Sequence, residues 1–462
     1  MSFLVYSLRS CAASLCLASV VVLAGCGGEP SAVDGTIRSH FWGAFAVDAA
    51  VDSVADYRGF EVLIADGLPG EWDTLAYGVS GPDGIVEMEV TAPRADIFTL
   101  QVSRSGAALV RDEIVVADGD SATVKVTFPL GSRPMLIRSR ENAVLMGFKN
   151  TLATHAMAIQ ELQRAGESDP APYRNRVLQS AEILWGLGET NPGTIAGELA
   201  SSQSILLLQD VNDSLLVARS QVIDQFNPNF QTVVETARRT EMLLHGSPAA
   251  VTLMQGFLER ATDPGPRVAV LTELIIAYRD NLQVDEAVTL AQQMKVEFQD
   301  SSVTAWADRA LYDLQNLMPG MAAPDFQAVT TAGDTISLAS FRGRALLLEF
   351  YAPGPAFERE LNVRNAFYRA TVEGADRFEM VSFSLQPDRD LNAAFFQDRD
   401  IPGIHVFLEE SLDAAIVEHY NINLLPTRFV IDADGVLVGK YVRDNATQAF
   451  QDALTVSLRR PS

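Results

Sequence analysis

Short apolar runs with polar residues at alternate positions dominate the chain from residue 36 to residue 132. The clearest runs are EVLIADG, GPDGIVEMEV, IFTLQVSRSG, EIVVADGD and ATVKVTF, and turn residues such as Gly, Asp and Pro separate them. Alternation with a period of two residues at this spacing predicts an N-terminal β-sandwich. We interpret this module as a spacer or a binding module.

The apolar period changes to that of helices between residues 138 and 317. Pro- or Gly-containing breaks at ESDPAP, ETNPG, FNPN, HGSP and TDPGP divide this region into helices of ordinary length, so we predict a central all-α domain. The stretch RVAVLTELIIAYRDNLQVDEAVTLAQQMKVEFQDS resembles one tetratricopeptide unit. A repeat fold needs about three units to bury a continuous core, so an ordinary helical domain remains the alternative.

Strands and helices alternate in the last region, residues 318–462. Two short strands and a turn at Gly333 precede the buried strand ALLLEFY, and EMVSFSL and HVFL are further strands between helical segments. A hairpin turned at Asp434-Gly435 and a closing helix end the chain. This order predicts an α/β domain with helices on both faces of its sheet.

An export signal occupies residues 1–25. Arg9 precedes an apolar core that is too short for a comfortable membrane span, which argues against the alternative of an uncleaved anchor. The ending Leu23-Ala24-Gly25-Cys26 resembles the lipobox of bacterial lipoproteins. That resemblance implies cleavage before Cys26, lipid on its thiol and a tether over residues 26–35. Because Gly27 is not the aspartate that signals inner-membrane retention in many lipoproteins, we expect an outer-membrane anchor facing the periplasm.

Composition narrows the possible partners. The chain has 462 residues, which suggests about three domains. Its formal charge of -24, without a dense Lys/Arg run, argues against nucleic acid as a partner. The five histidines lack ligand-like spacing, so we expect no metal site, and we expect no cofactor. All three cysteines lie in the leader or at its end, at positions 11, 16 and 26.

Three motifs in the last region resemble the thioredoxin-like redoxins, especially envelope-anchored thiol:disulfide reductases and, more distantly, alkyl hydroperoxide reductases. They are Ala323-Pro324-Asp325-Phe326, Phe350-Tyr351-Ala352 and Leu425-Pro426-Thr427. The resemblance covers about residues 318–458. It implies that Pro426 is cis and faces the reactive site, and that the backbone beside it pairs with a substrate peptide as an added strand.

The redox cysteines of that family are missing here. Counting forward from Tyr351 places the two sulfur positions at Pro355 and Glu358, and aligning the downstream acid places them at Gly354 and Phe357. Neither register contains a cysteine, and none of these residues can form a mixed disulfide. We therefore predict a degenerate redox site and no dithiol or thiol-peroxidase chemistry within this chain.

Glu349 occupies the place of the buried acid behind the sulfurs in thioredoxin. Desolvation in a strand interior would raise the pKa of such an acid, which could mark a working site. The alternative is that Glu349 lies at a strand edge or pairs with an arginine.

These observations predict a non-enzymatic envelope lipoprotein that binds a protein or peptide partner, with the membrane engaged through lipid on Cys26. We expect the partner groove to be formed by Leu425, Pro426 and Thr427 and lined by Leu424 and Phe357. The main alternative is a redoxin-class thiol:disulfide oxidoreductase or peroxidase-related enzyme with altered chemistry or thiols supplied by a partner. Ligand binding by the helical domain is a third possibility.

Overall fold

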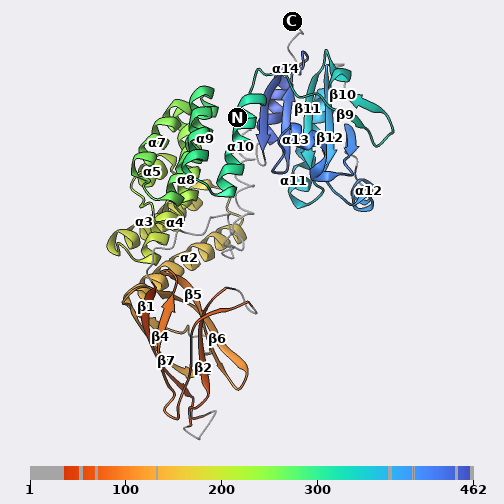
Figure 1. Cartoon of the computed structure of the whole chain (residues 1–462). Coiled ribbons are helices and arrows are strands. Elements are labelled where there is room, and N and C mark those ends of the chain that lie inside the picture. The colour runs from red at the N-terminus through yellow and green to blue at the C-terminus, as the bar shows by residue number, and fades with distance from the viewer. Residues whose placement is uncertain are drawn as a thin grey trace. The chain divides into compact units, whose positions relative to one another are not determined.

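The structure, a computed structural model, describes residues 36–50, 56–67, 71–131, 134–372, 377–397, 399, 401–442 and 446–457. The export signal and Cys26 lie outside these residues, so the lipidation of Cys26 stays a prediction. The chain divides into two compact units, one ending at Leu282 and one beginning at Gln283. Each unit is described by itself below (Figure 1).

The first unit begins with two four-stranded sheets, in the orders β4-β1-β7-β8 and β3-β2-β5-β6. Strands β1 and β7 are parallel, and the other pairs are antiparallel. Apolar side chains from both sheets, including Phe41, Phe60 and Phe98, form one buried core. The strands are β1 (Ile37–Val47), β2 (Phe60–Asp66), β3 (Asp73–Val79), β4 (Ile85–Ala92), β5 (Asp96–Arg104), β6 (Ala107–Val116), β7 (Ser121–Phe128) and β8 (Ile137–Arg138).

The five runs singled out in the sequence correspond to β2, β4, β5, β6 and β7, whereas β1 and β3 were not identified individually. Strand β1 directs Phe41, Gly43 and Phe45 toward the core. A Cβ atom on Gly43 would lie 2.5 Å from the Phe45 ring, so only glycine fits at this position without displacing that ring. Glycine interrupts the apolar alternation that would have marked the strand.

Helices follow the sheets in the first unit, and most successive helices pack against one another. Side chains of Ser139, Asp169 and Thr194 accept hydrogen bonds from backbone N–H groups in the first turn of the helices that they precede. The helices are α2 (Arg140–Arg164), α3 (Pro170–Thr190), α4 (Ile195–Leu207), α5 (Asp213–Ser220), α6 (Phe230–His245), α7 (Ser247–Arg260) and α8 (Pro264–Asp280).

Two further helices, α9 (Val284–Glu297) and α10 (Ser301–Asn316), belong to the second unit. Hydrogen bonds join α10 to the α/β region, for example from Lys440 to Asp313 and from Tyr312 to the carbonyl of His419. The predicted boundary at residue 317 is therefore not where the compact units divide. The stretch that resembles a tetratricopeptide unit spans the division, because α8 ends in the first unit and α9 begins in the second.

The second unit contains a five-stranded sheet in the order β13-β12-β11-β14-β15, with β11 at its centre. Strands β11, β12 and β13 are parallel, and β14 and β15 run antiparallel to their neighbours. A separate hairpin, β9-β10, precedes the sheet. The strands are β9 (Gln327–Val329), β10 (Thr335–Ser337), β11 (Ala345–Tyr351), β12 (Phe378–Ser384), β13 (Ile404–Phe407), β14 (Thr427–Ile431) and β15 (Leu437–Val442).

Both faces of this sheet are covered, as predicted. Leu347 and Phe378 pack with Phe450 in a cluster that includes residues of α11 and α14. Leu348 and Phe383 point to the opposite face, where residues of α13 and the β9-β10 hairpin complete a second cluster. The helices are η1 (Leu338–Phe341), α11 (Pro355–Val372), α12 (Arg389–Gln397), η2 (Ser411–Asp413), α13 (Ala415–His419) and α14 (Ala446–Ser457).

Candidate functional site

The turn between β11 and α11 occupies the place of the missing cysteines. Helix α11 begins at Pro355, a position where the absent N–H and the fixed φ of proline suit a helix start. The carbonyl of Gly354 accepts a hydrogen bond from the N–H of Glu358 at 2.9 Å. Pro355 and Glu358 are exposed, whereas Gly354 is half-buried. The first of the two registers therefore places both sulfur positions at the surface.

Phe357 is buried beneath this turn and does not line an open groove, which corrects the sequence prediction. Its ring stacks on Tyr351, with the ring centroids 4.1 Å apart, and lies 6.0 Å from the ring of Phe395. The aliphatic side chain of Ile401 packs with these three rings in one hydrophobic cluster. An aromatic side chain gains more by burial against other rings than by exposure, so the helix turns Phe357 inward.

The loop of residues 421–426, called here the Pro426 loop, leads into β14. Its Leu425–Pro426 peptide bond is cis, as the resemblance implied. Because Thr427 pairs with Phe350, the end of the loop lies beside the end of β11. Leu424 is 39% exposed, and Leu425 is half-buried against the core. Within the described part of the chain, no backbone hydrogen bond engages Leu425.

Glu349 lies at the centre of a buried ionic cluster behind this surface. Arg364 of α11 donates to its Oε2 at 2.8 Å, and Arg428 of β14 donates to its Oε1 at 2.9 Å. Ser382 of β12 also donates to Oε2, at 2.9 Å. The side chains of Glu349, Arg364 and Arg428 are fully buried. Three strands and one helix are thus joined through one carboxylate.

The pKa of Glu349 is lowered to about 2, not raised as its burial alone suggested. Burial does favour the neutral acid, but the charges of Arg364 and Arg428 together with hydrogen bonds outweigh it. Pairing with arginine was the alternative left open for this residue. A carboxylate held in this way remains ionised at neutral pH and does not exchange protons there.

Arg428 extends the cluster toward the surface, because its Nη2 donates to Glu360 of α11. Burial alone would lower the pKa of Arg428, but Glu349 and Glu360 raise it above the usual value. Sequence reasoning missed Arg364, Ser382 and Arg428. The sequence did contain a signal for Arg428, because it is the one charged residue in the strand TRFVI, which is buried throughout. A buried charge needs a partner of opposite sign.

An ion pair lies at the exposed rim of the site. Arg399 Nη2 donates to Glu358 Oε1 at 2.7 Å, with side chains 39% and 43% exposed. This pair is open to solvent, so it contributes little to the stability of the site.

The described residues contain no group of three or more His, Cys, Asp or Glu side chains arranged to hold a metal ion. In the same residues, no helix has both the length and the apolar composition that crossing a bilayer would require.

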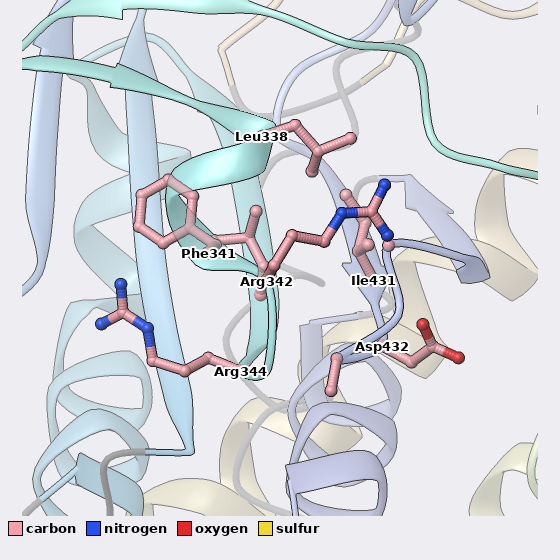
Figure 2. Close-up of a pocket in the computed structure, with 9 residues that line it drawn as sticks. Leu338, Phe341, Arg342, Arg344, Ile431 and Asp432 are labelled. Atoms are coloured by element: carbon pink, nitrogen blue, oxygen red, sulfur yellow. The ribbon is translucent and has the colours of Figure 1, made fainter. Parts of the chain in front are cut away.

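A shallow surface hollow lies at the other end of β11 and β14, near Leu346 and Ile431. Figure 2 shows Arg342 extending toward the β14-β15 hairpin, whereas Arg344 points away from it. The carboxylate of Asp432 accepts from the N–H groups of Asp434 and Val436 within that hairpin. This hollow is separate from the candidate site, because the Pro426 loop joins the opposite end of β14.

Residues 318–456 match the family model described as Redoxin. No curated protein matches the chain. Many solved structures are similar to about 30% of it, and three of them are named here. One is a protein from Chlorobium tepidum described as a thiol:disulfide interchange protein DsbE, with 23% sequence identity, covering 30% of this chain and 99% of that chain, at a TM-score of 0.26. Another is a thioredoxin domain of a thiol-disulfide oxidoreductase from Bacteroides vulgatus, with 20% identity, covering 30% of this chain and 97% of that chain, at a TM-score of 0.27. The third is a thiol-disulfide oxidoreductase from Bacteroides fragilis, with 25% identity, covering 28% of this chain and 98% of that chain, at a TM-score of 0.25. The C-terminal part of the chain, residues 318–456, is a redoxin domain with a thioredoxin-like fold.

Proposed function

We propose that this protein is a cell-envelope lipoprotein whose redoxin domain binds a protein or peptide and carries out no dithiol chemistry. The observation that carries the proposal is which residues occupy the positions where the family has its redox cysteines. The sequence has no cysteine after Cys26, and Phe357 fills the space beneath the turn by stacking on Tyr351. The residues that remain there can pack and form hydrogen bonds, but they cannot exchange disulfides.

The surface beside the Pro426 loop supports peptide binding. Leu424 exposes an apolar side chain, and the backbone of Leu425 has no hydrogen-bond partner among the described residues. An extended peptide can add to such a backbone as a strand, with its side chains packed on neighbouring apolar groups. We therefore propose a partner site at Leu424, Leu425 and the exposed Pro355. Pro426 and Thr427, which the sequence predicted in the groove, are buried, so their side chains are left out of this site.

The other regions extend the proposal. We infer that the two N-terminal sheets form a β-sandwich module and that the helices present a tetratricopeptide-like or ordinary helical binding surface. Lipid on Cys26 would attach the protein to the outer membrane, with its domains in the periplasm. The support for this attachment is the Leu-Ala-Gly-Cys ending after an apolar core.

A second candidate is a redoxin-class enzyme that uses thiols supplied by a partner. The match to the Redoxin family model favours it. An activity assay on residues 27–462 separates the two proposals. We expect no reduction of a model disulfide and no consumption of peroxide with a dithiol donor, and turnover clearly above the protein-free blank would favour the enzyme.

Site-specific photocrosslinking tests the binding site directly. A photoreactive residue in place of Leu424 should crosslink a partner in the native envelope. The matched control is the same residue in place of Leu412, which is 64% exposed in η2. Equal crosslinking from both positions, or crosslinking from position 412 alone, would move the partner site away from the Pro426 loop.

A further inference from the structure

Helix α10 contacts the Pro426 loop through polar side chains. Asn421 is the first residue of the loop, and its Nδ2 donates to Asp313 Oδ1 at 2.7 Å and to the carbonyl of Arg309 at 2.9 Å. Just before the loop, the carbonyl of His419 accepts a hydrogen bond from the Tyr312 hydroxyl at 3.0 Å. The start of the loop is thus fixed to one helix from outside the redoxin domain.

Lys440 of β15 completes this contact. Its Nζ donates to both carboxylate oxygens of Asp313, at 2.9 and 2.7 Å, and to the carbonyl of Asn421 at 3.2 Å. The side chains of Lys440 and Asp313 are only 15% and 20% exposed. Partial burial makes such charge-assisted hydrogen bonds stronger than those of an open surface pair.

The contact with α10 and Lys440 supports an unusual backbone conformation at Asn421. Its φ of 46° lies in the left-handed region, which asparagine tolerates better than most residues but which still needs support from its surroundings. The side chain of Asn421 is held by α10, and its carbonyl is held by Lys440. Asp313 connects both supports, because it accepts from Asn421 and from Lys440.

We infer that Asp313 is a positioning residue of the partner site, and that α10 sets the conformation of the Pro426 loop. The functional meaning of this inference rests on the proposed function, since the loop matters only if it binds a partner. The physical coupling between α10 and the loop is independent of any partner, and it can be measured in the free protein.

Hydrogen exchange of the soluble chain, residues 27–462, tests the coupling. The N–H groups of Tyr420, Asn421 and Ile422 donate to carbonyls of α13, so their exchange reports detachment of the start of the Pro426 loop from that helix. We expect the Asp313→Ala variant to exchange about 10-fold faster at these three positions, because it loses hydrogen bonds to a charged group. Asp313→Asn keeps an acceptor for Asn421, so its exchange rates at these positions should lie between those of the wild type and those of Asp313→Ala.

The matched control is Asp308→Ala on the same helix. Asp308 pairs with Lys295 of α9 and is 59% exposed, so its loss leaves the loop contacts in place. Lys440→Met removes the contact from the other side and should reproduce Asp313→Ala. Exchange unchanged in both Asp313→Ala and Lys440→Met, or equally accelerated in Asp308→Ala, would overturn the inference.

Photocrosslinking from position 424 then separates the two proposals. If the exchange result holds but no partner is crosslinked, the coupling stands and the proposed function fails. If a partner is crosslinked equally well in wild type and Asp313→Ala while exchange is unchanged, the proposed function stands and the inference fails.

Discussion

Two buried glutamates, one in each compact unit, have pKa values shifted in opposite directions. Glu349 lies in the redoxin domain, and Glu273 lies in α8 of the first unit, where Arg238 donates to it at 2.5 Å. The pKa of Glu349 is lowered to about 2, whereas the pKa of Glu273 is raised. Burial favours the neutral acid in both, so the difference comes from the neighbouring charges.

The number of arginines that bind each carboxylate explains why the two pKa values shift in opposite directions. Glu349 has two buried arginines, one on each oxygen. Glu273 depends mainly on Arg238, which also pairs with Asp280 at 3.3 Å. The nearby Glu235 raises the pKa of Glu273 further. Burial by itself therefore does not identify a carboxyl group that can exchange protons.

This comparison bears on function. Glu349 occupies the place of the buried acid in thioredoxin, but here it is held as an anion by Arg364 and Arg428. It connects β11 to α11 and β14, which are the elements that border the candidate site. We interpret Glu349 as a structural centre of the site and not as an acid–base group.

Removing the carboxylate from the redoxin domain should have the largest effect. Glu349→Ala leaves two buried arginines without their common anion, and such losses typically destabilise a protein by about 3–5 kcal/mol. Native-state hydrogen exchange of the β11 amides in the soluble chain measures this loss. Amides of α2–α8 serve as the internal control and should keep their protection. A loss below about 1 kcal/mol would contradict the assigned role of Glu349.

Acid titration should affect the two units differently. The folded-state pKa of Glu349 lies below its usual value of 4.5, so its stabilisation is complete above about pH 4.5 and is lost as the pH falls toward 2. This difference corresponds to on the order of 3 kcal/mol. The raised pKa of Glu273 acts with the opposite sign, because its contribution is lost as the pH rises through the folded-state value.

Hydrogen exchange between pH 5 and 3 measures this contrast, after correction for intrinsic exchange. Protection of β11 should fall with pH in the wild type and should fall less in Glu349→Gln, which has no titrating group there. An equal pH dependence of β11 protection in both proteins would show that Glu349 does not govern it.

The neutral replacement of Glu273 should have the smallest effect of the three. Because ionisation of Glu273 is already disfavoured, Glu273→Gln should destabilise the first unit by about 1 kcal/mol, comparable to one hydrogen bond. The matched variant Glu349→Gln should cost clearly more in the second unit. Hydrogen exchange measured at increasing urea concentrations gives the loss of unfolding free energy in each unit. A larger loss in Glu273→Gln than in Glu349→Gln would reverse the comparison.

The sequence by itself determined the class of the C-terminal domain and the chemistry that it lacks. The motifs around Ala323, Phe350 and Pro426 predicted a redoxin fold, and the family match confirms it. Periodicity also located most strands and helix breaks, because local backbone preferences and one-sided burial leave a pattern along the chain. The missing sulfur needed only a count of cysteines.

Only the tertiary structure decided how the residues of the site are used. Phe357 turned inward because the nearby Tyr351 and Phe395, which is distant in sequence, offer it aromatic contacts. Glu349 became a stable anion because two arginines on other elements reach it, and Asp313 joined the Pro426 loop through a helix assigned by sequence to another domain. Such outcomes depend on contacts between side chains far apart in the chain, and periodicity contains no information about these contacts.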